Sequence, residues 1–302
     1  MRPDRRTCLL GAGAGLLTAA LPSAAVGAGE RGRVREVELG QGTLVAIEDG
    51  ALTLGPQDFR DVDEAEAEAL LSQGGGSSLN AFLFRDGTRN VLIDAGGAGF
   101  LSDAGGLTAA LETLDLEPRQ IDTILLTHLH VDHIGGLMAD GERVFPFAEI
   151  QVQIDEVRYW NSPLEMRQAP EFQHPTFEAV RDLFSAYGYR IKDFSAEGEV
   201  IPGVAAVPLP GHSPGHTGYL VGEGPDAVLV WGDLVHSAAL QFPHPGSTFR
   251  DDVDAEQAAE TRLAVLDRVV AEDRRVAGMH LPFPGIGRVV REGETYRWKG
   301  VD

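Results

Sequence analysis

Residues 124–136 read Ile-Leu-Leu-Thr-His-Leu-His-Val-Asp-His-Ile-Gly-Gly and place four potential metal ligands within six positions. The apolar start predicts a buried strand over Ile121–Thr127. His128, His130, Asp132 and His133 follow directly after it. Three imidazoles and a carboxylate at the end of a buried strand need a cation or a polar partner to satisfy them. The stretch therefore predicts a metal site at a strand end, with a solvated polar loop as the alternative.

Three further segments each offer one candidate ligand. His212 lies in a Pro- and Gly-rich run after an apolar stretch, where those residues predict a tight turn. Asp233 follows a second apolar stretch, and His280 follows a long helical pattern. Each segment alone is weak evidence, because a lone histidine is more often a hydrogen-bonded core or surface residue. His216, in the same turn as His212, is expected to brace that turn, with metal ligation as the alternative.

The apolar periodicity downstream of residue 28 predicts a layered α/β fold. Runs that are too short for helices predict strands at Leu79–Phe84, Val91–Ile93, Ile121–Thr127, Ile150–Ile154, Val204–Leu209, Thr217–Val221 and Ala227–Trp231. Helical spacing appears at Leu107–Leu114, Phe177–Tyr187 and Ala255–Ala271. Because paired strands come first and are then interrupted by helices, we expect sheets packed together in one domain over residues 29–302.

Composition restricts the class of protein and its partners. The chain has 302 residues, of which 43% are hydrophobic and 24% charged, which is typical of a globular protein. Its formal net charge of −21 argues against nucleic acid or anionic lipid as a partner. The single cysteine, Cys8, excludes a disulfide framework and a cysteine-ligated zinc site in the body of the protein.

The first 28 residues have the pattern of an export signal. Arg5 and Arg6 precede a short, weakly apolar run and then small residues that end at Ala28. This order is typical of a cleaved signal, and the arginine pair resembles a twin-arginine signal, so we expect an exported, periplasmic or extracellular protein. An uncleaved membrane anchor is the alternative, although the run is short of the ~20 apolar residues that a span needs.

Together, the ligand segments resemble the metallo-β-lactamase superfamily, whose members have an αβ/βα four-layer sandwich with a two-metal site. The resemblance covers Leu79 to Pro284 and includes the segment at 91–96, where Asp94 is expected to support a ligand. Segments 231–236, 241–243 and 280–287 are similar to the branch of methyl parathion hydrolase and related lactonases. The resemblance implies one metal held by His128, His130 and His212, and a second held by Asp132, His133 and His280, with Asp233 bridging both.

The resemblance also implies a hydrolase with two divalent ions, most simply Zn²⁺, although the ligands also accept manganese, iron or cobalt. A hydroxide that bridges the metals would attack the substrate, so the protein need not supply a nucleophile. Asp132 or Asp233 could carry the proton to the leaving group. His236, three residues after Asp233, is a candidate acid for a departing alkoxide, with a place in the pocket wall as the alternative.

For the substrate, the resemblance places aromatic pocket walls at Phe100, Trp160 and Phe177, although Phe177 also fits core packing. An apolar pocket beside two metals favours a lactone or a carboxylic ester, including acyl-homoserine lactones. A phosphotriester is the runner-up; β-lactam hydrolysis and a mononuclear iron persulfide dioxygenase are less favoured, as is a metal-dependent binding protein without turnover. We expect a small-molecule substrate, no nucleic acid, and a homodimer as an open alternative.

Overall fold

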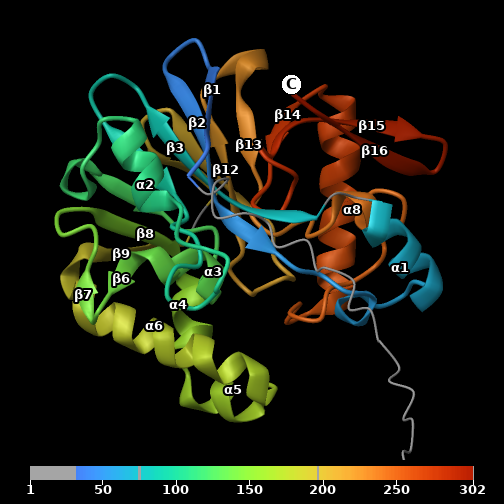
Figure 1. Cartoon of the computed structure of the whole chain (residues 1–302), viewed down its shortest axis with the longest axis horizontal. Helices are drawn as coiled ribbons and strands as arrows, with labels where there is room; N and C mark the ends of the chain where they lie inside the picture. Colours follow the sequence, from blue (N-terminus) through green and yellow to red (C-terminus); the bar gives the residue numbers. More distant parts are fainter. Residues whose placement is uncertain (1–31, 74–75, 196, 302) are drawn as a thin grey trace, which may run out of the picture.

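The computed structural model describes residues 32–73, 76–195 and 197–301. The expected export signal at residues 1–28 lies outside these described residues. The chain forms two seven-stranded sheets that face each other, with helices on the outer side of each sheet (Figure 1). This arrangement confirms the predicted αβ/βα sandwich.

The first sheet contains the N-terminal strands. In spatial order they are β1 (Val34–Glu38), β2 (Thr43–Leu52), β3 (Ser77–Arg85), β4 (Asn90–Ile93), β5 (Thr123–Leu125), β8 (Glu149–Gln153) and β9 (Ile191–Phe194). Strands β1 to β4 pair antiparallel, whereas β4, β5, β8 and β9 pair in parallel. A small hairpin of β6 (Met138–Ala139) and β7 (Glu142–Arg143) stands apart.

The second sheet contains the C-terminal strands in chain order: β10 (Gly198–Ile201), β11 (Val204–Pro208), β12 (Thr217–Val221), β13 (Val228–Val230), β14 (Arg275–Ala277), β15 (Ile286–Glu292) and β16 (Thr295–Gly300). Only β13 and β14 pair in parallel, because the long helix α8 (Ala255–Ala271) connects them. The other pairs in this sheet are antiparallel.

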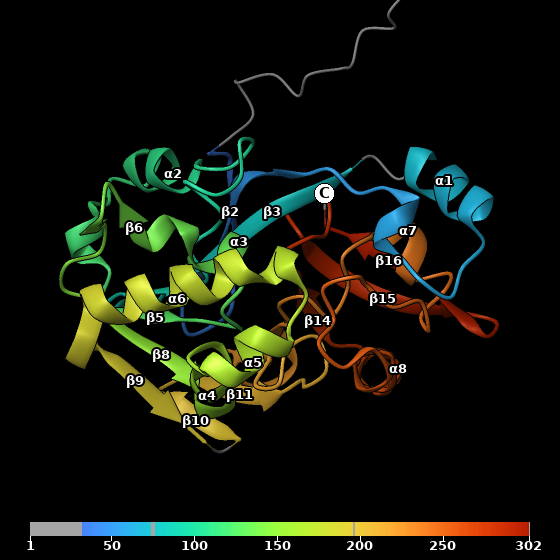
Figure 2. The ribbon, with the colours of Figure 1, turned by 90° about the horizontal axis from the view of Figure 1, so that it is seen from below.

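Helices cover the outer faces, and α6 and α8 lie on different sides of the molecule (Figure 2). The first sheet is accompanied by α2 (Leu107–Thr113), α3 (Val131–Ile134), α4 (Ile154–Trp160), α5 (Pro163–Gln168) and α6 (His174–Tyr187). Near the second sheet, α1 (Glu64–Gln73) lies beside α7 (Ala238–Gln241). None of the helices in the described residues has the length and apolar content that crossing a bilayer requires.

The alternation of side chains along the strands produces the layers. On β2, Val45 and Ile47 pack into the core beneath the helices, whereas Leu44 and Ala46 pack into the core between the two sheets. On β13, Val228 and Val230 face the space between the sheets, and neighbouring Leu229 packs toward α8. Because both faces of these strands are buried, their sequences read as continuous apolar runs.

Most predicted elements appear in the structure with small shifts. Strand β12 and helix α8 have the predicted bounds, and α6 begins three residues before the predicted start at Phe177. The predicted strand Ile121–Thr127 is shorter, because the chain leaves the sheet after Leu125 and turns toward the ligand residues. Strands β1, β2, β6, β7, β9, β10 and β14 to β16 were not predicted.

Candidate metal centre

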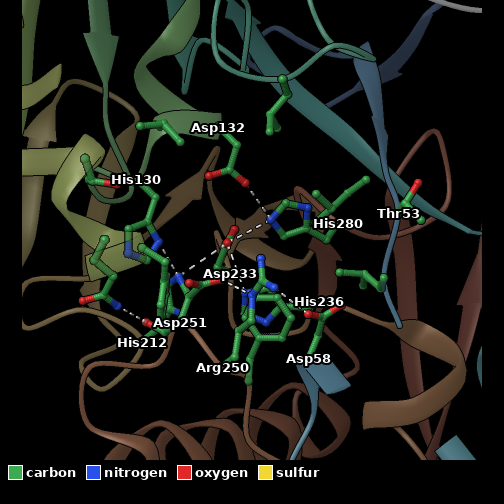
Figure 3. A pocket seen from close by; sticks show the side chains of 18 of the residues that line it. Thr53, Asp58, His130, Asp132, His212, Asp233, His236, Arg250, Asp251 and His280 are labelled. Carbon is green, nitrogen blue, oxygen red and sulfur yellow. Dashed lines mark hydrogen bonds and ion pairs between the residues drawn. The ribbon is translucent and has the colours of Figure 1, made fainter. Parts of the chain in front are cut away.

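The predicted ligands meet at one edge of the sandwich, where strands of both sheets end. Figure 3 shows five of them, His130, Asp132, His212, Asp233 and His280. The loop after β5 and the short helix α3 supply residues 128–133. The loops after β11, β13 and β14 supply the others. The structure thus brings together all seven residues of the predicted set: His128, His130, Asp132, His133, His212, Asp233 and His280.

Three histidine nitrogens converge in the first group. His130 Nδ1 lies 2.9 Å from Nε2 of His128 and 2.9 Å from Nε2 of His212. Burial lowers the pKa of His128 and His130 well below the usual value for histidine, so both rings are neutral near pH 7. Neutral imidazole nitrogens aimed at one point offer lone pairs to a cation.

The second group joins two carboxylates to two histidines. His280 Nε2 lies 2.9 Å from Oδ2 of Asp233 and 3.4 Å from Oδ2 of Asp132. His133 Nε2 lies 3.1 Å from Oδ1 of Asp233. Burial alone would raise the pKa of Asp233, but the nearby His133 and His280, whose own pKa values are raised, outweigh it and hold this pKa well below its ordinary value. The second group therefore presents ionised oxygens and imidazole nitrogens together.

Asp233 lies between the two groups. Its Oδ2 is 3.5 Å from Nε2 of His212 and 3.9 Å from Nε2 of His128, and its Oδ1 faces His133. One carboxylate thus lies next to histidines of both ligand groups. The carboxylate of Asp132, by contrast, lies next to His133 and His280 of the second group.

The residues present fit divalent cations. In the described part of the chain, the buried atoms His133 Nε2 and Asp233 Oδ1 face each other at 3.1 Å without forming a hydrogen bond. Buried polar atoms without a partner are costly, and a cation at this position would satisfy them. Imidazole and carboxylate ligands without a thiolate suit zinc, manganese, iron or cobalt, so the ligand set does not select one metal.

Residues behind the ligands fix the direction of each ring. Asp94 accepts hydrogen bonds from Thr127 N (2.8 Å) and from His133 Nδ1 (2.7 Å), which is the predicted supporting position. Asp252 accepts one from His212 Nδ1 at 2.8 Å. With Nδ1 engaged in this way, Nε2 of both rings is left for a metal. Sequence reasoning missed Asp252, because its position just before α8 suggested only a favourable charge at the helix start.

Sequence reasoning also missed Glu156, although it contacts the loop after β5 and the loop after β11, which supply the three histidines of the first group. Its buried carboxylate accepts hydrogen bonds from the backbone N–H of Leu129 (3.1 Å) and Gly215 (2.8 Å) and from Trp160 Nε1 (2.8 Å). Burial raises the pKa of Glu156 above its usual value. A single glutamate in the amphipathic helix α4 gives no signal in the sequence for such a role.

His216 braces the turn, in agreement with the preferred interpretation. Its Nδ1 donates to the carbonyl of Leu209 (2.9 Å), and its Nε2 accepts from the backbone N–H of Asp233 (3.0 Å). Burial lowers the pKa of His216 to about 3, which keeps the ring neutral. Gly232 makes this contact feasible, because a Cβ there would lie 2.4 Å from His216 Nε2 and its φ of +58° favours glycine.

His236 faces the same cavity as the ligands. Its Nε2 lies 3.2 Å from Oδ2 of Asp233, and its ring stacks on Phe249 with centroids 3.8 Å apart. Burial lowers the pKa of His236 to about 4, so a neutral ring with one N–H donor is present near pH 7. Together with His212 and Asp233, it forms a third group that could hold a metal ion.

A cavity of about 330 Å³ opens onto the ligands. Its walls include the apolar side chains of Leu52, Leu54, Leu101, Phe172 and Phe249, and the charged side chains of Asp58, Arg250 and Asp251. This lining differs from the predicted aromatic walls.

The three predicted wall residues do not line this cavity. Trp160 and Phe177 are buried in the core between the first sheet and its helices, where their ring centroids are 4.7 Å apart. Trp160 reaches the site only from behind, edge-on to the ring of His130. Phe100 is 47% exposed outside the cavity. Phe172 and Phe249 provide the aromatic surface instead, because α6 turns Phe177 toward the core.

Comparisons with known proteins agree with this geometry. A family model described as the metallo-beta-lactamase superfamily matches residues 74–272. The beta-lactamase-like protein 2 homolog of Drosophila melanogaster is 32% identical over 215 residues, which cover 70% of this chain and 60% of that protein. The chain therefore spans about six tenths of the length of this relative, and a similar share of the uncharacterized protein YobT of Bacillus subtilis.

Two solved structures have closely similar folds. The hydrolase AbOPH, described as a member of the beta lactamase superfamily, is 31% identical with a TM-score of 0.83, over 89% of this chain and 97% of that one. AidC, described as a dizinc quorum-quenching lactonase in complex with a homoserine product, has the same TM-score and coverage at 24% identity. The likeness to AidC shows the fold alone.

Proposed function

The chain belongs to the metallo-β-lactamase superfamily, and we propose that it is a metal-dependent hydrolase of lactones or carboxylic esters. One observation carries the proposal: two groups of ligand side chains lie next to each other at one side of a partly apolar cavity, and Asp233 of the second group is 3.5 Å from His212 of the first. Two divalent ions bound there would acidify a water molecule and polarise a carbonyl oxygen. His128, His130 and His212 would hold one ion, and Asp132, His133 and His280 the other.

The residues around the ligands support hydrolysis at a carbonyl group. Leu52, Leu54 and Leu101 would exclude water from an acyl chain or a ring. The ionised Asp132 and Asp233 would accept the proton of the attacking water. Asp132 or Asp233 would then pass this proton to the oxygen that leaves, and His236, a neutral ring beside Asp233, would donate a hydrogen bond to that oxygen. Acyl-homoserine lactones are the first lactones to test, because AidC is described with a homoserine product.

Hydrolysis of an aryl phosphotriester is the second candidate. The segments that carry Asp233, His236 and His280 resemble methyl parathion hydrolase, and Phe172 and Phe249 offer aromatic faces for an aryl group. An aryl oxide is a stable leaving group and needs no proton donor, so His236 matters less for this reaction. Position 236 therefore distinguishes the two candidates.

A rate panel on protein of measured metal content, expressed without residues 1–28, tests the proposal. It compares aliphatic and acyl-homoserine lactones, an aryl ester, methyl paraoxon and a cephalosporin. We expect two metals per chain, with lactone and ester rates well above the others. A dominant rate with methyl paraoxon would favour the second candidate, and one iron per chain would favour the dioxygenase alternative.

Two variants extend the panel. Asp233→Ala should retain less than a tenth of the wild-type rate on every substrate, because both ligand groups lose an oxygen. His236→Leu should lower the lactone rate more than the phosphotriester rate. His244→Leu, at an ion pair with Glu66 away from the cavity, is the control for the loss of an imidazole. Equal losses on both substrates in His236→Leu would reject the leaving-group role.

We also propose that residues 1–28 direct export through a twin-arginine pathway, on the basis of the sequence pattern alone. Expression of the full chain in a bacterium with that pathway should yield a periplasmic protein that begins near residue 29. Replacing Arg5 and Arg6 with lysine should retain it in the cytoplasm, and an unchanged distribution would reject the proposal.

A further inference from the structure

We propose that Asp58 and Asp251 make the cavity selective for uncharged substrates by neutralising Arg250; this inference rests on the proposed hydrolase function. Arg250 is the only arginine or lysine among the described residues that line the cavity. An arginine beside a hydrolytic centre would ordinarily bind a carboxylate or phosphate of the substrate through its planar fork of N–H donors. In this protein two nitrogens of that guanidinium, Nη1 and Nε, already face carboxylates.

Arg250 is held between two acids. Its Nη1 lies 2.8 Å from Oδ1 of Asp58, and its Nε lies 3.4 Å from Oδ2 of Asp251 (Figure 3). The guanidinium also lies 5.9 Å from the ring centroid of Phe172, which covers one of its sides. The side chain of Arg250 is 53% exposed, so a substrate can reach it from the mouth of the cavity. Its positive charge is nevertheless balanced by the two neighbouring carboxylates.

Asp58 cannot easily move aside for a substrate anion. Its side chain is only 5% exposed, and its Oδ2 accepts a hydrogen bond from the backbone N–H of Gly55 at 2.7 Å. Its backbone carbonyl accepts from the backbone N–H of Arg250 at 2.9 Å, which fixes the two residues side by side. The pair is therefore part of the folded wall of the cavity.

The charge balance then disfavours anions. Asp58 and Asp251 together carry two negative charges, against the single positive charge of Arg250. The carboxylate of Asp132 lines the same cavity. A substrate with a negative group away from the reacting carbonyl would have to approach these carboxylates without a free cation to receive it. Like-charge contact of this kind is an effective means of rejecting a competing ligand. Neutral acyl chains and lactone rings can pack against Leu52, Leu54 and Leu101 without this electrostatic repulsion.

The test uses a matched pair of esters with the same leaving group, 4-nitrophenyl butyrate and 4-nitrophenyl 4-sulfobutyrate, and the full-length protein at low salt. A sulfonate is a poor metal ligand, so its charge reports on the wall and not on the metals. The measured quantity is the ratio of kcat/KM for the anionic ester to that for the neutral ester. We expect this ratio to rise about tenfold in Asp58→Asn, to fall in Arg250→Gln, and to approach unity in wild type at high salt.

A control variant separates local from overall charge. Asp226→Asn changes the net charge of the protein by the same amount. The carboxylate of Asp226 is exposed and pairs with Arg275 outside the cavity, so this variant should leave the ratio unchanged. An equal rise in this control, or an unchanged ratio in Asp58→Asn, would overturn the proposal.

A binding measurement distinguishes this proposal from the hydrolase itself. The corresponding 4-nitroanilides of butyric and 4-sulfobutyric acid resist hydrolysis, and their affinities can be compared by calorimetry. If neither ester is hydrolysed while Asp58→Asn still strengthens binding of the anionic anilide, the proposed esterase activity fails and the charge selectivity stands. If both anilides bind wild type and Asp58→Asn with the same relative affinity, the charge selectivity fails whatever the activity.

Discussion

At the scale of single residues, Glu156 joins the two loops that supply the first ligand group. Its Oε2 accepts from Leu129 N, between His128 and His130, and its Oε1 accepts from Gly215 N, in the turn of His212. One carboxylate thus sets the distance between ligands that are 82 residues apart in the sequence. A residue that touches no predicted ligand atom can in this way influence metal affinity.

We therefore predict that Glu156→Gln weakens metal binding. An amide has a single acceptor oxygen, so its NH₂ group would face one of the two backbone donors, which costs about 1–3 kcal/mol. Chelator competition should show roughly 10- to 100-fold weaker affinity for one of the two metals. Glu178→Gln, on the exposed face of α6, is the matched control. Unchanged affinity together with a lower melting temperature would show that Glu156 supports only the fold.

A second residue-scale prediction concerns pH. The pKa of His216 falls from about 6.5 to about 3 on folding, because the buried ring is desolvated. The folded state then binds fewer protons than the unfolded one, so the stability that His216 contributes is complete above pH 6.5 and is lost as the pH falls toward 3.

The comparison is between wild type and His216→Gln in the free energy of unfolding by guanidinium chloride. At pH 7.5 the variant should be less stable by about 1–3 kcal/mol, because the Leu209 carbonyl or the Asp233 N–H loses its partner. The difference should shrink between pH 6.5 and pH 4.5. A difference that stays constant over this range would contradict the assignment of the neutral ring.

At the scale of elements, helix α8 fixes the chain that carries the cavity wall. Arg262 is buried in this helix and donates to the carbonyls of Leu234 (2.7 Å), Pro245 (3.0 Å) and Ser247 (2.7 Å). These carbonyls belong to the segment between Asp233 and Arg250. A buried arginine that satisfies three backbone oxygens acts as a link between the helix and this loop.

Arg262→Met should accordingly lower the free energy of unfolding by about 3–5 kcal/mol, since it leaves buried carbonyls without donors. Arg268→Met on the same helix removes an exposed pair with Glu272 and should cost less than about 1 kcal/mol. If the two substitutions proved equally mild in denaturant titrations, the link would have no energetic role.

The elements also show what the sequence could predict. Strand β12 was predicted with the correct bounds because turn residues flank it on both sides. Helix α8 was predicted correctly because its apolar residues follow the 3.6-residue period of a helix. Strand β2 was missed because it carries Glu48 and Asp49, two buried carboxylates whose partners lie elsewhere in the chain. The exposed arginines and glutamate of β15 interrupt its apolar pattern in the same way.

The candidate ligands could be predicted for a related reason. Each of them follows the end of a strand or a helix, which is a local feature, and the edge of the sandwich gathers these ends. Asp252 and Glu156 could not be predicted, since their roles depend on contacts across 40 or more residues. The aromatic cavity wall was predicted at the wrong residues for the same reason. Packing decides which side of α6 faces the core, so Phe177 is buried there. Phe172, just before this helix, lines the cavity instead.

At the scale of the whole molecule, the metal centre lies between the two halves of the chain. The loop after β5 of the first sheet supplies His128 to His133, and loops of the second sheet supply His212, Asp233 and His280. Cations bound at this edge would connect the two sheets directly. Without them, His128, His130 and His212 have only one another's nitrogens at 2.9 Å, and buried atoms such as His133 Nε2 and Asp233 Oδ1 form no hydrogen bond.

Removal of the metals should therefore destabilise the entire fold and not only the loops. A ligand present at about a thousand times its dissociation constant contributes about 4 kcal/mol to stability. In a domain of this size, that corresponds to a decrease in melting temperature on the order of 10 °C when a chelator strips the protein. Calorimetry before chelation, after chelation and after return of zinc measures the effect, with metal content assayed at each step. The drop should be smaller in Asp233→Ala, which lacks the carboxylate that we propose to bind both ions. A melting temperature that is unchanged after verified removal would mean that the packing of the two sheets holds the ligands in place without the metals.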